Sequence, residues 1–265
     1  MKKIIFFSAI IISLVFTAIA QENTMYVMKN GKVVGKYILN SEVDSLILYQ
    51  PKTHTGNTFS DSRDGNVYKT VAIGNQIWMA ENLKYLPSVM SPGTSSVTTS
   101  CYYVYGYDGI SVNDAKTTTN YKTYGVLYNW HAAMNGATSS TSNPSGVQGA
   151  CPAGWHVPSD SEWTELADFL GSESVAGGKL KESGTENWYS PNTDATNQSG
   201  FTALPGGNRV IDGTFYGIKN YGVWWSATEF YSFDSWNRSL GYNFSNLSRG
   251  SHEKELGYSI RCIKN

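Results

Sequence analysis

The sequence is poor in charged residues and in cysteine, and it lacks long apolar runs beyond its first 20 residues. Charged side chains make up 15% of its 265 residues, and the formal net charge is −1. Neither nucleic acid nor an anionic membrane is an expected partner, because both bind strongly basic surfaces. A transmembrane helix needs about 20 consecutive apolar residues, so we also expect no transmembrane segment after residue 20.

Short motifs that mark common enzyme classes are also missing. The sequence contains no Cys-x-x-Cys, no Gly-x-Ser-x-Gly and no glycine-rich phosphate loop, and His252-Glu253 lacks the second histidine of a zinc-protease helix. Distant histidines and aspartates can still meet in a folded chain, but their spacing gives no reason to name a catalytic set. We therefore predict no catalytic residue, no metal site, no cofactor and no enzymatic activity.

The first 20 residues have the pattern of a secretory signal peptide. Lys2 and Lys3 precede an apolar run over residues 4–15, and Ala18-Ile19-Ala20 forms a small-residue cleavage site before Gln21. The apolar run is too short for a transmembrane helix. We therefore expect an exported protein that is secreted, periplasmic or held at the cell surface.

Three cysteines stand in the sequence, Cys101, Cys151 and Cys262. In an oxidising compartment two of them are expected to be bridged, which leaves one unpaired. A bridge between Cys151 and Cys262 would close a loop of about 110 residues, for which the chain-entropy model gives a stabilisation of about 4 to 5 kcal/mol. This is the disulfide that we predict, although the sequence alone leaves the other two pairings open.

Composition and turn signals predict a mostly β protein with a small N-terminal unit. The 26 glycines and 18 tyrosines favour short strands and ordered loops over long helices. Asn30-Gly31 lies between two strand-like runs and predicts a hairpin, and a further strand is expected over residues 41–49. We divide the chain into four parts: a signal peptide (1–20), a small β segment (21–50), a linker (51–60) and a main domain (61–265).

The main domain contains one helix whose two ends are both marked in the sequence. Ser159 and Glu162 have the spacing of a capping box, and Gly171 is placed to end the helix. Four apolar residues recur at helical spacing in between: Trp163, Leu166, Ala167 and Leu170. A second helix is predicted over residues 126–134. We assign His156 and Glu162 structural roles, and the capping box explains Glu162.

Strands are expected on both sides of the capped helix. Gly74-Asn75 joins two β-prone runs and predicts a second hairpin. Several short segments between residues 201 and 263 are separated by turn residues, and they predict one twisted antiparallel system.

Seven motifs follow one another through the main domain. They are Asp64-Gly-Asn-Val-Tyr, Trp78-Met-Ala-Glu-Asn-Leu, Tyr124-Gly-Val-Leu-Tyr-Asn-Trp, Cys151-Pro-Ala-Gly-Trp-His-Val-Pro-Ser-Asp-Ser-Glu-Trp, Phe201-Thr-Ala-Leu-Pro-Gly-Gly, Trp225-Ser-Ala-Thr-Glu and Ile260-Arg-Cys. Through them the chain resembles the Fibrobacter succinogenes major paralogous domain family over about residues 61–265. That family consists of exported bacterial proteins without an established biochemical activity. Residues 25–49 resemble the small β segment often found ahead of such domains.

A more distant resemblance bears on the fold. The segment Trp155-His-Val-Pro-Ser-Asp-Ser-Glu-Trp and the closing residues 257–262 are similar to two motifs of formylglycine-generating enzymes. This resemblance implies an α+β, C-type-lectin-like fold, an irregular scaffold with twisted antiparallel strands, two main helices and long loops. It does not carry the oxidase chemistry over, because those enzymes use a copper-binding cysteine pair and no cysteine lies between Cys151 and Cys262.

The resemblance leaves the aromatic loops as the candidate binding surface. The calcium-mediated sugar site of C-type lectins is not implied, since Trp236-Asn237 is followed by Arg238 instead of aspartate. Aromatic side chains offer an apolar face and, in tyrosine and tryptophan, a polar tip to a glycan or a protein. Six residues are our candidates for ligand binding: Trp188, Trp224, Trp225, Trp236, Tyr103 and Tyr105. At least half of the four tryptophans are nevertheless expected to belong to the core.

Three functions remain in competition. We predict an exported, non-enzymatic module that binds a glycan or protein ligand. One alternative is an extracytoplasmic enzyme with an unrecognised site on the same scaffold. The other is a structural subunit of a surface appendage, in which residues 21–50 serve for assembly.

Overall fold

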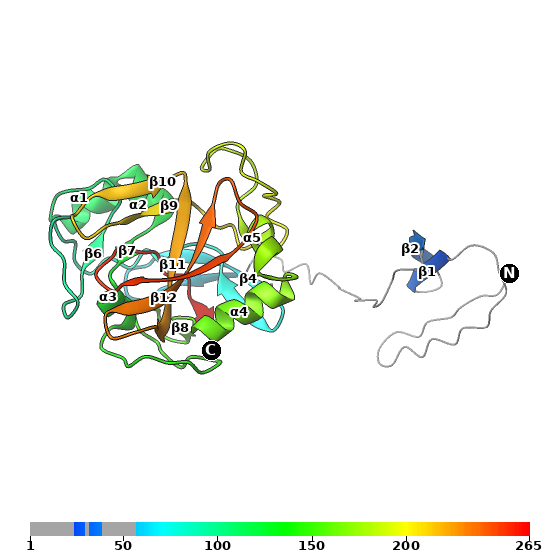
Figure 1. Cartoon of the computed structure of the whole chain (residues 1–265), viewed down its shortest axis with the longest axis horizontal. Coiled ribbons are helices and arrows are strands. Elements are labelled where there is room, and N and C mark those ends of the chain that lie inside the picture. The colour runs from blue at the N-terminus through cyan, green and yellow to red at the C-terminus, as the bar shows by residue number, and fades with distance from the viewer. Residues whose placement is uncertain (1–23, 30–31, 39–56) are drawn as a thin grey trace. The chain divides into compact units, whose positions relative to one another are not determined.

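The computed structural model describes residues 24–29, 32–38 and 57–265, and the chain divides into two compact units, Met1–Lys52 and Thr53–Asn265 (Figure 1). In the first unit, β1 (Thr24–Lys29) and β2 (Lys32–Ile38) form an antiparallel pair. This confirms the hairpin predicted around Asn30-Gly31. The signal peptide and the strand expected over residues 41–49 lie outside the described residues.

The second unit begins earlier than predicted. Strand β3 (Asn57–Ser60) pairs with β4 (Val67–Ile73), so the last four residues of the predicted linker belong to the domain. Phe59 packs on Trp155 with 5.3 Å between the ring centroids. A four-residue edge strand with one apolar side chain shows no usable periodicity, which explains why the sequence did not reveal it.

One sheet joins the two ends of this domain. Its strands lie in the order β3, β4, β5 (Gln76–Met79), β14 (Ile263–Lys264) and β8 (Trp155–His156). The antiparallel pairing of Ile73 with Gln76 confirms the predicted Gly74-Asn75 hairpin. Ile263 pairs with Trp78 on one side and His156 on the other, so the end of the chain is held between two distant segments.

The second large sheet carries the later strands. Its order is β10 (Phe215–Ile218), β9 (Gly206–Arg209), β11 (Tyr221–Glu229), β12 (Asp234–Gly241) and β13 (Ser248–Glu253). The prediction of one antiparallel system is wrong in two respects. Strands β9 and β11 are parallel, through Gly222 and Gly207, and the chain end joins the other sheet as β14. The sequence of a short strand does not indicate which strand it pairs with, because this pairing depends on contacts between distant segments.

Five helices lie in the described part of the chain, rather than the two main helices expected. They are α1 (Val112–Thr117), α2 (Thr119–Tyr124), α3 (Trp130–Met134), α4 (Asp160–Phe169) and α5 (Glu173–Leu180). The capping box of Ser159 and Glu162 is present at α4, as predicted. The helix predicted over residues 126–134 is shorter, because Asn129 caps α3 and the preceding Leu127–Tyr128 forms the two-residue strand β7, paired with β6 (Tyr102–Tyr103).

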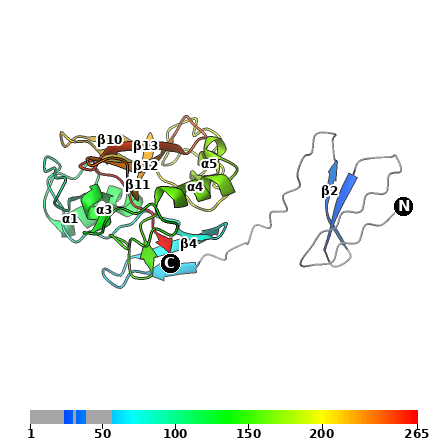
Figure 2. The same cartoon turned by 60° about the horizontal axis from the view of Figure 1, so that its bottom comes forward.

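The core lies between the two large sheets. In Figure 2 the sheet with β11, β12 and β13 lies above the sheet with β4, and α3 and α4 are seen between them. Trp163 of α4 contacts Trp78 of the lower sheet at 4.7 Å and Trp224 of the upper sheet at 6.3 Å between ring centroids. A disulfide joins Cys151 to Cys262, as predicted, and Cys101 is buried and unpaired. The fold is a mixed α/β arrangement with several sheets.

Candidate functional site

Most of the six predicted binding residues belong to the core. Trp188, Trp224, Trp225 and Tyr103 are each at most 1% exposed, so the assignment of these four side chains to a binding surface is wrong. The indole N–H of Trp224 donates to Asn82 Oδ1 (2.9 Å), and that of Trp225 donates to Tyr128 O (2.8 Å). The expectation that at least half of the four tryptophans belong to the core is confirmed, because three of them are buried.

The reason for this error lies in the way β11 is covered. Successive residues of a strand face opposite sides of the sheet. Trp224 and Trp225 therefore point in opposite directions, and each enters a different part of the hydrophobic core. Both faces of β11 are buried, so a tryptophan on either face of this strand lies in the core.

Trp236 and Tyr105 are partly exposed, and the ring of each packs against neighbouring side chains. Tyr105 packs against Phe215 with 5.2 Å between ring centroids. The guanidinium carbon of Arg249 lies 3.4 Å from the ring centroid of Trp236, and Phe230 packs on the same indole at 4.5 Å. Trp236 therefore supports its aromatic neighbour instead of presenting its own surface.

An exposed aromatic group stands at the turn between β11 and β12. Phe230, Tyr231 and Phe233 are 37%, 66% and 71% exposed, and we call these three residues the aromatic tip. The rings of Phe230 and Tyr231 lie 4.1 Å apart. Sequence reasoning missed these residues, although three aromatics among four positions of a short turn are themselves an unusual signal, since turns favour Gly, Pro, Asn, Asp and Ser.

Lys254 holds the aromatic tip from beneath. Its ammonium group donates to Ser232 O (2.8 Å) and to the Glu229 carboxylate, and it lies 4.6 Å from the ring centroid of Trp130. Its backbone N–H donates to Phe233 O (2.9 Å). Lys254 is itself buried, so these bonds fix the turn from the inside and leave the three rings outward.

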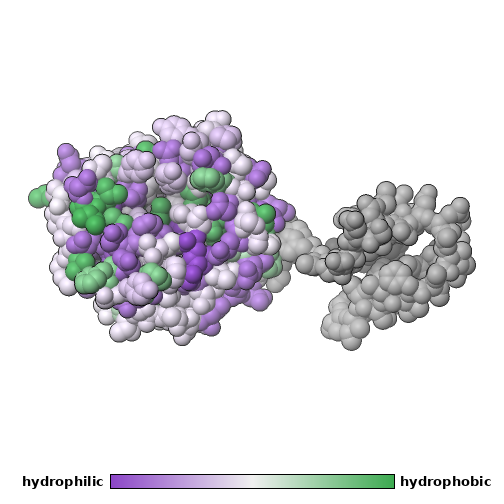
Figure 3. All heavy atoms as spheres, viewed as in Figure 1, coloured by the Kyte–Doolittle hydropathy of each residue, from purple (hydrophilic) through white to green (hydrophobic). Residues whose placement is uncertain are grey.

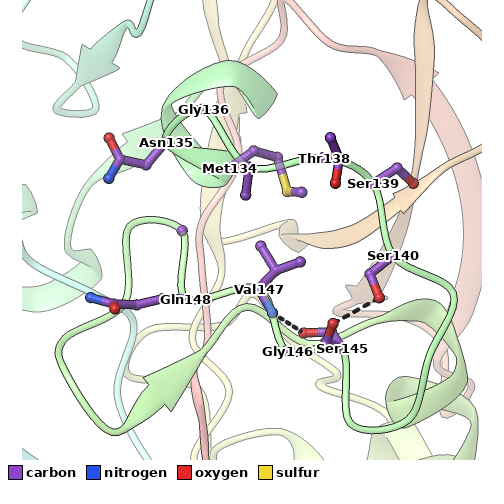
Figure 4. A pocket seen from close by; sticks show the side chains of 12 residues that line it. Met134, Asn135, Gly136, Thr138, Ser139, Ser140, Ser145, Gly146, Val147 and Gln148 are labelled. Atoms are coloured by element: carbon purple, nitrogen blue, oxygen red, sulfur yellow. Dashed lines mark hydrogen bonds between the residues drawn. The ribbon is translucent and has the colours of Figure 1, made fainter.

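A groove lies beside the aromatic tip. It has a volume of about 590 Å³ and runs between two facing segments, residues 134–140 and 145–149 (Figure 4). We call it the serine groove. No charged side chain lines it. Gly149 permits the close approach of the two segments, because an added Cβ there would lie 2.2 Å from Ala133 O.

The serine groove and the aromatic tip share a wall. Ser139 Oγ accepts a hydrogen bond from the backbone N–H of Glu229 (2.9 Å), the residue before the tip. Ser140 N donates to Ala227 O (2.9 Å), and Thr228 Oγ1 donates back to Ser140 O (2.6 Å). The upper wall of the groove is therefore attached to the last residues of β11, directly next to Phe230.

Other exposed apolar side chains lie on several different elements of the domain, among them Ile110, Tyr216 and Phe244. Figure 3 shows one face of the domain, on which apolar residues form small, separate patches among polar ones. A second cavity of about 510 Å³ lies along α4, and acidic Glu165 and Asp168 help to line it. The Glu165 carboxylate accepts from Asn143 Nδ2 (2.7 Å). This cavity lacks the cluster of outward rings that marks the aromatic tip.

His156 and Glu162 form a contact that resembles a catalytic pair but is closed to substrate. His156 Nε2 lies 2.7 Å from Glu162 Oε1, and His156 Nδ1 lies 2.7 Å from Asn265 Oδ1. Glu162 Oε2 accepts the backbone N–H groups of Ser159 (2.9 Å) and Ser145 (3.1 Å). Both His156 and Glu162 are 2% exposed, so the pair is part of the core, in agreement with the structural roles predicted for them.

The His156 contact predicts a pH-dependent contribution to stability. Burial alone lowers the pKa of His156, but the hydrogen bond and the charge of Glu162, with a further hydrogen bond to Asn265, raise the pKa overall above 6.5. A raised pKa in the folded state means that the proton favours folding. This stabilisation is fully present below the unfolded pKa and is lost as the pH rises through the folded pKa.

We therefore expect His156→Gln to destabilise the protein more at about pH 5.5 than at about pH 9. Urea unfolding of both proteins at each pH measures this, and the difference between wild type and variant cancels the titration of groups that do not contact His156. Equal differences at the two pH values would contradict the role assigned to the protonated imidazole.

Comparison with known proteins identifies the second unit. The family model of the Fibrobacter succinogenes major domain matches residues 71–264. Neither the search of curated proteins nor the search of solved structures found a match. In the part of the chain that the structure describes, no helix has the length and apolar character needed to cross a bilayer. The matched residues include the whole sheet of β9 to β13, most of the other large sheet, the disulfide and the aromatic tip, and the chain belongs to the Fibrobacter succinogenes major domain family.

Proposed function

We propose that this protein is an exported, non-enzymatic binding module that recognises a glycan or a protein through the aromatic tip. The observation that carries this proposal is the tip itself, three outward aromatic side chains on one braced turn. Large aromatic side chains normally contribute most of their area to a protein core. Their concentration at one exposed turn is therefore typical of a recognition surface.

The support beneath the aromatic tip favours binding over chance exposure. Lys254 is a buried cation that directs its donors to Ser232 O and Glu229, and Phe230 rests on Trp236. Burying a charged group has a cost, which these contacts offset. The result is a set of rings whose positions are fixed before a ligand arrives, and such preorganisation lowers the entropy lost on binding.

The disulfide and the leader pattern support export. A cysteine pair that is bridged persists in oxidising compartments, where a signal peptide would deliver the chain. A mature protein that begins at Gln21, as determined by mass spectrometry, would support this route. Detection of only the unprocessed chain would count against it.

The irregular architecture supports a C-type-lectin-like scaffold as the fold behind this function. Short strands alternate with long ordered loops, and the end of the chain lies in the same sheet as the first strands of the domain. We infer that the scaffold presents its long loops at its surface. A crystal structure that superposes on C-type-lectin-like proteins would support this inference, and one that does not would refute it.

The double variant Tyr231→Ser/Phe233→Ser is expected to lose at least about tenfold in ligand affinity, because aromatic anchors carry most of the binding energy of an interface. Retention on a glycan array and on immobilised matrix proteins measures this loss. The thermal midpoint of the variant should stay close to that of wild type, since both side chains are already exposed.

The matched control is Ile110→Ser/Tyr216→Ser, which removes two side chains that are 77% and 58% exposed elsewhere on the domain. This control should bind as wild type does. An equal loss in both double variants, or no loss in either, would contradict a role of the aromatic tip in recognition.

A further inference from the structure

We propose that the serine groove and the aromatic tip form one continuous site for a neutral oligosaccharide. This inference rests on the proposed binding function and adds the class of ligand. It requires that the two parts are adjacent, that both are rigid, and that neither selects for charge. The described residues meet each requirement.

The adjacency follows from the shared wall. Ser139 lines the groove and accepts a hydrogen bond from Glu229, which is followed directly by Phe230 of the tip. The wall of the groove and the aromatic tip therefore meet at Glu229, which allows one extended ligand to contact both. Both parts are fixed to β11 by the hydrogen bonds of residues 227–229.

The lining of the serine groove matches the chemistry of sugar hydroxyl groups. Hydroxyl and primary amide side chains can both donate and accept hydrogen bonds, as a sugar hydroxyl does. Asn135 and Thr138 line the groove and are exposed, and within the described residues their side chains have no hydrogen-bond partner. Figure 4 shows these two side chains on one wall and Gln148 on the other. These groups are free to exchange water for ligand hydroxyls.

The charges near the site disfavour an acidic ligand. The groove has no charged lining residue, and the strands that lead to the tip carry Glu229, Asp234 and Glu253. Lys254 is buried and already bonded to Glu229, so its charge is not offered to a ligand. The partly exposed Arg249, beside Trp236, is already paired with Asp160 (2.7 Å). A uronate, sulfate or phosphate group would therefore approach these carboxylates without an unpaired cation to bind it.

A neutral sugar fits the aromatic tip better than a protein partner does. A stable protein interface buries about 800 Å² on each side around an apolar centre. The tip has only three outward rings, and the surface beside it is a groove of hydroxyl, amide and backbone groups. A sugar ring has one apolar C–H face and a rim of hydroxyl groups, which corresponds to a ring surface next to a hydrogen-bonding groove.

The test uses the purified protein with named polysaccharides. Mannan, xylan and mixed-linkage glucan serve as neutral probes, polygalacturonate and heparin as acidic probes, and gelatin as a protein probe. Affinity electrophoresis should show retardation by at least one neutral polysaccharide. This retardation should change little between about 50 mM and 500 mM salt, because no charge pair forms in the complex.

Two sets of variants connect the binding to the proposed site. The tip variant Tyr231→Ser/Phe233→Ser and the groove variant Asn135→Gly/Thr138→Val should each weaken retardation by at least about tenfold. Glycine suits position 135, whose φ is +48°. Thr98→Val is the control for the groove, because Thr98 is exposed on another loop.

The outcomes separate this inference from the function on which it rests. Binding of gelatin that depends on the aromatic tip, without binding of a neutral polysaccharide, would overturn the inference and leave the binding function intact. Retardation by acidic probes alone, or by none of the polysaccharides, would also overturn it. Neutral binding that is insensitive to the groove variant contradicts the continuous site, and binding that is insensitive to the tip variant contradicts the proposed function as well.

Discussion

Replacing Cys151 and Cys262 together by alanine is expected to lower the free energy of unfolding by about 4 to 5 kcal/mol. The bridge spans a sequence separation of 111 residues, so it removes many conformations from the unfolded chain. It also joins the segment before β8 to the segment before β14, and these two strands pair in one sheet. Equilibrium unfolding in guanidinium chloride measures the loss directly.

Cys101→Ala provides the matched control for the disulfide variant. Cys101 is also buried, but it is unpaired, and its Sγ donates a long hydrogen bond to Thr99 O (3.6 Å). Its replacement should cost about 1 kcal/mol. A reductant should then destabilise the wild type and Cys101→Ala but leave the double variant unchanged. A double variant that is as stable as Cys101→Ala would contradict the contribution assigned to the bridge.

Arg261→Met is expected to destabilise the protein by about 3 to 5 kcal/mol, which is comparable with loss of the disulfide. Arg261 is 0% exposed, and its guanidinium donates to Asn82 Oδ1 (3.0 and 3.2 Å) and to the carbonyls of Met79 (3.2 Å), Phe201 and Thr202 (3.3 Å). Methionine fills part of the volume but removes the guanidinium donors from the three carbonyls and leaves Asn82 Oδ1 with Trp224 Nε1 alone. A buried polar group that loses its partner retains its full cost of desolvation.

The Arg261 variant also tests how the two sheets are joined. Asn82 accepts from Arg261 and, through the same oxygen, from Trp224 Nε1 (2.9 Å), while its amide donates to Tyr124 O (3.0 Å). Arg261→Lys should be intermediate, because lysine keeps the charge but lacks the planar fork. Lys122→Met, at an exposed position, should change stability by less than about 0.5 kcal/mol. If Arg261→Met unfolds at the same denaturant concentration as Lys122→Met, the contribution assigned to the hydrogen bonds of Arg261 is contradicted.

The features that the sequence predicted correctly are those written in neighbouring residues. The capping box needs Ser159 and Glu162 three positions apart, and the Gly74-Asn75 hairpin needs only a turn dipeptide between two β-prone runs. The disulfide was the favoured pairing, but its selection over the two alternatives required the fold. Local patterns thus account for the helix, the hairpins and the approximate extent of the domain.

The features that the sequence could not predict depend on contacts between distant segments. Strand β14 has two residues and finds its partners at Trp78 and His156, more than 100 positions away, without any periodic signal. The exposure of a tryptophan is decided by what covers it, which is why Trp224 entered the core. The aromatic tip was not predicted, because Phe233 lies exposed in a turn, where polar residues are more common.

The position of the binding site is tested most directly by hydrogen–deuterium exchange with and without the polysaccharide that retards the protein most. Recognition at the aromatic tip and the serine groove predicts slower exchange of backbone amides in residues 134–149 and 229–236. Exchange in β4 and β5 should stay unchanged, because these strands lie in the other sheet. Protection confined to the acidic cavity along α4, or to any surface without the aromatic tip, would contradict the proposed site.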